Sequence, residues 1–94
     1  MKNNNGARIR TRAVMLCKDV KFWDFIASNL ALVNMPKPEE FAKGYICKKC
    51  NIESRSELTS NKEAQSKFKK LDQRFIQWLN PIDEIYADNL EREN

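Results

Sequence analysis

Histidine is absent from this sequence, and glycine is scarce. The 94 residues include no histidine and only two glycines, Gly6 and Gly44. Without histidine, general acid–base catalysis would fall to a carboxylate or a lysine, and no pair of acidic residues lies in an apolar setting. Two isolated glycines cannot form a phosphate-binding loop. These absences predict a protein that is not an enzyme and that needs no cofactor.

Long apolar runs are also missing. The sequence has no apolar stretch of about 18 residues and no signal-peptide core, which predicts a chain that neither spans a membrane nor is secreted. Its three cysteines are too few for a disulfide scaffold and suit a reducing compartment. We therefore expect a cytoplasmic location.

Cys47 and Cys50 have the spacing of a zinc-ligand pair. A structural zinc site usually needs four ligands, and only Cys17 remains as a further thiolate in a chain without histidine. A thioredoxin-like role is disfavoured as well, because that motif opens a helix after a strand, whereas this pair lies near an expected helix end. Buried structural cysteines are the preferred interpretation, and no metal is expected.

Apolar residues recur at helical spacing along the chain, and no strand-like alternation appears. This pattern predicts an all-α fold, a small bundle of four to five helices. We expect a helix that starts near residues 8–12, a second at 20–32 after the N-cap Asp19, a third from Pro38 to about Cys50 that closes at Asn51, a single turn at 55–59, and a long amphipathic helix at about 61–79.

Local sequence signals also predict helix starts and buried faces. Two capping boxes are expected, at Ser54-x-x-Glu57 and Ser60-x-x-Glu63. The expected buried stripes are Phe22, Trp23, Ile26 and Leu30 in the second helix, Phe41, Ala42, Tyr45, Ile46 and Cys50 in the third, and Ala64, Phe68, Leu71, Phe75, Trp78 and Leu79 in the long one.

Charge divides the chain into three parts. Residues 1–8 are expected to be a flexible basic arm, residues 9–80 a single helical domain, and residues 81–94 an acidic tail that can form a short last helix. Formal charge is +5 over residues 1–18 and −4 over residues 81–94. This asymmetry predicts either anion binding at the basic end or head-to-tail contact, within one chain or between copies. Contact between copies would give a homo-oligomer.

Residues 41–58 have an arrangement similar to a helix-turn-helix. A helix, a turn at Asn51-Ile52-Glu53 and a new start at Ser54 would place Arg55 and Ser56 where base contacts are made. Against this, Leu58 lies one position late for the buried residue of a recognition helix, and a second cap at Ser60 would interrupt that helix. An ordinary corner between two helices is the preferred interpretation.

Basic residues are the remaining functional candidates. Three arginines alternate near the start of the chain, a pattern that suits phosphate contact, and lysines follow the outer side of the long helix. Solvation of an amphipathic helix is the alternative explanation for those lysines. The candidate nucleic-acid-binding residues are Arg8, Arg10, Arg12, Lys18, Arg55, Lys62, Lys69, Lys70 and Arg74.

One pattern extends over about residues 8–79. It comprises Arg12-Ala13-x-x-Leu16-Cys17-x-Asp19-x-x-Phe22, then Cys50-x-Ile52-x-Ser54-Arg55-x-Glu57-Leu58, then Ala64, Phe68, Leu71, Phe75 and Trp78. In these residues the chain resembles a family of small proteins encoded by tailed phages and prophages. The resemblance implies a gene among phage replication and recombination genes and a product in the host cytoplasm. It implies no particular activity, and Asn51 replaces the glycine usual at that position.

Two functions follow as hypotheses. The first is a non-enzymatic phage accessory protein that binds nucleic acid through phosphate contacts, in replication or recombination. The alternative is a protein-binding module or inhibitor that docks on a host or phage replication, recombination or defence protein. In that case the partner-binding residues would be the apolar positions of the acidic tail, Ile82, Ile85, Tyr86 and Leu90.

Overall fold

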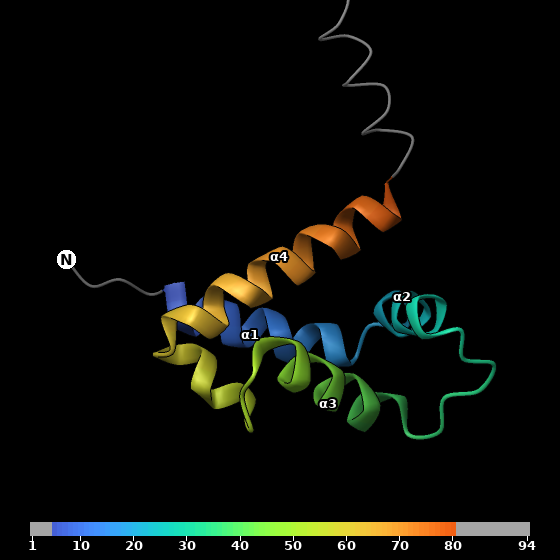
Figure 1. Ribbon diagram of the computed structural model, residues 1–94, viewed down its shortest axis with the longest axis horizontal. Helices are drawn as coiled ribbons and strands as arrows, with labels where there is room; N and C mark the ends of the chain where they lie inside the picture. The colour runs from blue at the N-terminus through green and yellow to red at the C-terminus, as the bar shows by residue number, and fades with distance from the viewer. Residues whose placement is uncertain (1–4, 81–94) are drawn as a thin grey trace, which may run out of the picture.

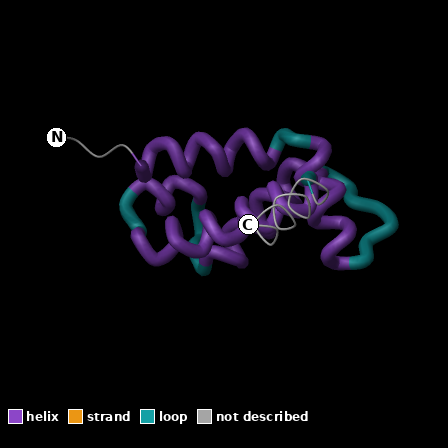
Figure 2. Tube along the Cα trace, turned by 90° about the horizontal axis from the view of Figure 1, so that it is seen from above, coloured by secondary structure: helices purple, strands orange, loops and turns teal. Residues whose placement is uncertain are grey.

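Five helical segments form a small all-α bundle in the computed structural model, which describes residues 5–80 (Figure 1). No strand occurs in that range, and the predicted fold class is confirmed (Figure 2). The segments are α1 (Asn5–Cys17), α2 (Val20–Leu30), α3 (Pro38–Cys50), the 3-10 helix η1 (Arg55–Thr59) and α4 (Lys62–Leu79). None of these helices is both long enough and apolar enough to cross a bilayer.

Most helix ends follow from local signals in the sequence. Asp19 caps α2 by accepting a hydrogen bond from the backbone N–H of Lys21 (2.9 Å). Helix α3 has Pro38 in its first turn and closes at Asn51, which adopts the left-handed conformation at φ 60°. The capping box of η1 is also present, with the Glu57 carboxylate accepting from the Ser54 N–H (3.2 Å).

The start of α4 differs from the prediction. Its N-cap is Asn61, whose side-chain oxygen accepts a hydrogen bond from the Ala64 N–H (3.0 Å). The capping box expected at Ser60 is therefore wrong. Ser60 instead closes η1, and its own N–H donates to the Glu57 carbonyl (3.3 Å). Because Ser60 is the C-cap of η1, Asn61 is the first residue free to take the extended N-cap conformation.

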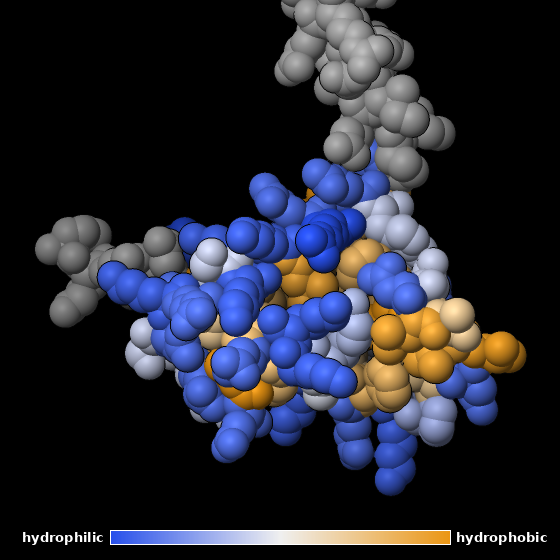
Figure 3. All heavy atoms as spheres, viewed as in Figure 1, coloured by the Kyte–Doolittle hydropathy of each residue, from blue (hydrophilic) through white to orange (hydrophobic). Residues whose placement is uncertain are grey.

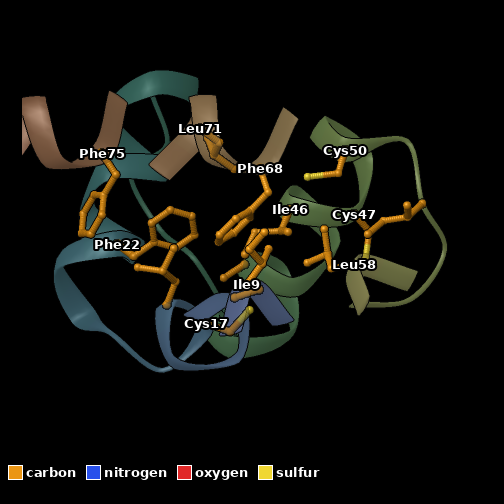
Figure 4. Close-up of a cluster of buried hydrophobic side chains, with 14 of the residues drawn as sticks. Ile9, Cys17, Phe22, Ile46, Cys47, Cys50, Leu58, Phe68, Leu71 and Phe75 are labelled. Carbon is orange, nitrogen blue, oxygen red and sulfur yellow. The ribbon is translucent and has the colours of Figure 1, made fainter. Parts of the chain in front are cut away.

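The buried core draws on every helix and is centred on large aromatic rings (Figure 4). Phe22 of α2 is fully buried and meets Phe75 of α4 edge to face, with ring centroids 5.1 Å apart. Phe25, on the same face of α2, lies 5.4 Å from Phe75 and 5.7 Å from Trp78. Tyr45 brings α3 to the same cluster, 6.4 Å from Phe22.

Three predicted core positions are wrong. Phe41 is 38% exposed, because α3 turns Ala42, Ile46, Cys47 and Cys50 toward the core instead. Leu30 is 46% exposed, because the buried face of α2 is set by Phe25, which packs on α4. Trp78 is 40% exposed and lies at the edge of the aromatic cluster, near the end of α4.

Helix α1 begins earlier than expected, so part of the predicted flexible arm is helical. Residues 5–8 belong to α1, and residues 1–4 lie outside the described part of the chain. The reason is tertiary: Gly6 lies directly against the backbone of Thr59 in η1, and Ile9 is buried. The acidic tail, residues 81–94 with Ile82, Ile85, Tyr86 and Leu90, also lies outside the described residues.

Gly6 and Gly44 provide a matched test of the contact between α1 and η1. A Cβ on Gly6 would clash with the carbonyl oxygen of Thr59, so Gly6→Ala should lower the free energy of unfolding by about 1–3 kcal/mol. A Cβ on Gly44 meets nothing, so Gly44→Ala in the middle of α3 should raise it by about 0.5–1 kcal/mol. Urea denaturation followed by circular dichroism measures both. Equal effects of the two substitutions would contradict this packing.

Candidate nucleic-acid interface

The described residues carry most of the positive charge of the protein. Residues 5–80 hold 15 Lys and Arg and 8 Asp and Glu, a formal charge of +7. No acidic residue occurs within α1, and α4 holds Glu63 and Asp72 against five basic residues. The positive charge is therefore concentrated in α1 and α4.

Arg12 is engaged within the protein by an ion pair with Asp72. Its guanidinium makes two parallel hydrogen bonds to the Asp72 carboxylate, at 2.9 and 3.1 Å. The two side chains are 39% and 20% exposed. A bidentate pair of this kind fixes α1 against α4. The structure thus assigns Arg12 a packing role that the sequence did not suggest, because its partner is sixty positions away in the chain.

Arg8 and Arg10 remain exposed on α1. Arg8 lies one helical turn before Arg12, and Lys69 one turn before Asp72, so both flank the Arg12–Asp72 ion pair. Lys62, seven residues before Lys69, shares that side of α4. This side of the bundle also exposes Met15 and Ile76, so its surface is mixed.

Lys18 and Arg55 lie together at another place, in a groove of about 310 Å³ between α1, α3 and η1. Glu39, Glu40 and Lys43 line the same groove, so carboxylates and cations are mixed there. Arg55 is half-buried beside Cys17, and η1 is a single five-residue turn. A recognition helix is therefore not present at this corner, and the ordinary helix corner is what the structure contains.

A third group of basic residues, Lys49 and Arg74, lines a groove of about 540 Å³ between α2, α3 and α4. We call this the aromatic groove; its lining residues are Phe25, Asn29, Leu30, Tyr45, Lys49, Leu71, Arg74, Gln77 and Trp78. None of these described residues is acidic. The same face of the molecule shows hydrophilic side chains from α3 and α4 around apolar atoms between them (Figure 3).

Each long wall of the aromatic groove repeats one arrangement, a basic and an aromatic side chain one turn apart. On α3, Lys49 follows Tyr45 by four residues, and its Nζ lies 5.5 Å from the centre of the tyrosine ring. On α4, Trp78 follows Arg74 by four residues, and Lys70 precedes Arg74 by four. Sequence reasoning missed Lys49, Tyr45 and Trp78 as site residues, because the i, i+4 spacing is visible within each helix but the packing that brings the two walls together is not.

The three cysteines are free and buried, and they come from two different helices. Figure 4 shows the side chains of Cys47 and Cys50 pointing in different directions. Among residues 5–80, no three His, Cys, Asp or Glu side chains lie close enough to hold a metal ion. Burial raises the pKa of all three thiols, that of Cys50 to about 11, and at Cys17 the nearby Arg55 partly offsets this rise.

The raised pKa of Cys50 makes the stability of the fold depend on pH. Above about pH 9 the thiol ionises in the unfolded chain but stays protonated in the folded one until about pH 11. The free energy of unfolding should therefore fall as pH rises through this window, by up to about 1.4 kcal/mol per pH unit for this thiol. Urea denaturation across the window measures the slope. Cys50→Ala should make it shallower, and an unchanged slope in that variant would contradict the assignment.

No protein-family model, curated protein or solved structure matches this chain. The resemblance to small phage proteins therefore stays a prediction.

Proposed function

We propose that this protein is a non-enzymatic phage accessory protein that binds nucleic acid through its phosphates. The observation that supports this most is the aromatic groove, because Lys49 and Arg74 line it from two helices and no described lining residue is acidic. Clustered lysine and arginine side chains bind the phosphates of nucleic acids whatever the base sequence.

The proposed contact surface extends from the groove along α4. Lys70 lies one turn before Arg74, and Lys67 lies seven residues before it, so the three share one side of the helix. Glu63 is the one acidic residue of α4 near this row, and its carboxylate is 3.8 Å from the Lys67 Nζ. Lys49 lines the opposite side of the groove. Lys48 and Lys49 both lie in the last turn of α3, where they also favour the helix dipole.

The remaining sequence candidates have different places in this proposal. Arg8 and Arg10 on α1, with Lys62 and Lys69 on α4, would extend the surface for a longer nucleic acid. Lys18 and Arg55 face carboxylates and contribute less. Arg12 contributes through the fold, because Asp72 already neutralises it.

The salt dependence of binding tests the proposal. Each neutralised phosphate contributes about −0.9 to the log–log slope of affinity against salt on duplex and about −0.7 on single strands. The triple variant Lys49→Gln, Lys70→Gln, Arg74→Gln should flatten the slope by about 2–3 units. Fluorescence anisotropy of labelled duplex and single-stranded oligonucleotides measures it.

A matched control separates this surface from net charge. Lys21→Gln, Lys37→Gln and Lys43→Gln remove the same charge at exposed positions that do not line the aromatic groove, and they should leave the slope nearly unchanged. Equal losses in the two triple variants would show that only total charge matters. Absence of binding to every nucleic acid at low salt would remove the proposal.

A second candidate function, docking on a host or phage protein, is favoured by one observation. Val33 in the connection between α2 and α3 is fully exposed, and Leu30 and Phe41 on either side of this connection are also exposed. An apolar patch visible at this edge of the molecule in Figure 3 is a feature of protein-binding surfaces.

The two functions predict opposite results in one capture experiment. If the protein docks on a partner, a complex captured from phage-infected cells should survive nuclease and be lost in Val33→Asp. It should persist in the Lys49, Lys70 and Arg74 triple variant. Mass spectrometry with isotope-labelled wild type and variants measures how much of the partner each protein captures. A complex that nuclease removes, and that depends on the three basic residues, would contradict protein docking.

A further inference from the structure

We infer that the aromatic groove holds an unpaired nucleobase, so that the protein binds single-stranded nucleic acid in preference to duplex. The inference rests on the proposed function and specifies its substrate. Five properties of the groove support it: its size, its aromatic rings, its charge, its amide groups and its recessed position.

The size of the groove suits a ring-containing ligand. Its volume of about 540 Å³ lies within the range of about 300–1,000 Å³ typical of small-molecule sites. Such a space between three helices is larger than a phosphate group alone requires. A base together with the adjoining sugar and phosphate is the unit of a nucleic acid that would occupy it.

Aromatic side chains supply surfaces on which a base can stack. Trp78 is 40% exposed, although its indole is supported from within by two buried rings. Phe75 stacks with it at 6.5 Å and an interplanar angle of 21°, and Phe25 meets it at 5.7 Å. The indole is therefore held in place while part of it stays accessible. Base–aromatic stacking of this kind is independent of sequence, because every base has a π-face.

The charge of the groove selects an anionic partner over a neutral aromatic one. Lys49 and Arg74 stand on opposite walls, one turn from Tyr45 and Trp78 respectively. A base stacked on Trp78 would thus have its flanking phosphates near one cation on each wall. Tracking of a backbone by cations beside stacked bases is the mode by which single strands are bound.

Amide side chains complete the lining. Asn29 and Gln77 lie on α2 and α4, and Asn29 donates a hydrogen bond to the Tyr45 hydroxyl (3.3 Å). Each amide offers both a donor and an acceptor, so each can pair with the edge of any base. This lining favours bases without choosing strongly between them.

The groove lies between helices, and a base must leave the helical stack to enter it. In a duplex that step costs unpairing and unstacking, a few kcal/mol per base. In a single strand the base is already unpaired. The same groove therefore discriminates between the two forms without reading sequence.

Tryptophan fluorescence tests this inference directly, because the two tryptophans lie in different places. Trp23 donates its indole N–H to the Cys17 carbonyl (2.7 Å) and does not line the aromatic groove. In the Trp23→Phe variant, Trp78 is the sole reporter, and a short oligothymidylate should quench it strongly. In Trp78→Phe, the remaining Trp23 signal should stay nearly constant on the same titration.

Affinity gives the second readout. Trp78→Ala should weaken single-strand binding by about tenfold to a hundredfold, the loss measured for one stacked base. The exposed control Val33→Ala should change it by less than about twofold. Circular dichroism verifies that each variant is folded, and Arg74→Gln, an exposed substitution, provides a second groove variant that leaves the aromatic core intact.

The outcomes separate this inference from the function on which it rests. Tighter binding to oligothymidylate than to a blunt duplex of equal charge, with quenching of Trp78, supports it. Equal binding to both forms with Trp78 unquenched overturns the inference and leaves phosphate binding standing. Absence of binding to either form overturns both.

Discussion

The contact between Phe22 and Phe75 determines how three helices meet. Phe22 is fully buried, and its ring meets Phe75 at 89° while also lying 5.8 Å from Phe25 and 6.4 Å from Tyr45. Through this one residue α2 is fixed against both α3 and α4. The aromatic groove is the space that remains outside the same contact, so its shape depends on the core beneath it. A substitution that alters the packing of Phe22 on Phe75 would therefore also alter the shape of the aromatic groove.

Helix ends were predictable wherever the signal is local. Asp19, Pro38, Asn51 and the Ser54 capping box each act through their own backbone neighbours, and each is observed as expected. The predictions were wrong where contact with a distant segment of the chain sets a helix boundary or a buried face. The early start of α1 depends on Gly6 against Thr59, more than fifty residues away in the chain. Periodicity identified α3 as amphipathic but did not show that Cys47 would be buried in place of Phe41.

The candidate site was predictable to a smaller extent than the fold. Lys70 and Arg74 were identified from the amphipathic pattern of α4, which is a property of one helix. Lys49 and Tyr45 belong to α3 and join them only because the two helices pack together. Arg12 shows the converse case, since a residue that looked free in the sequence is neutralised by Asp72. Cationic surfaces arise from tertiary structure, and a charge count along the chain cannot separate free from paired cations.

The last turn of α4 has a consequence for the energetics of the groove. Gln77 and Trp78 belong to this turn, which ends at Asn80 with hydrogen bonds from its N–H and its side-chain amide to the Ile76 carbonyl. Helix ends open locally at a lower free-energy cost than the core. The part of the α4 wall that Gln77 and Trp78 form therefore depends on this turn being closed, whereas Leu71 and Arg74 precede it. Under the proposed function, apparent affinity scales with the fraction of molecules in which the turn is closed. Closing of the last turn of α4 would thus tune the strength of the proposed binding at a groove that three helices line.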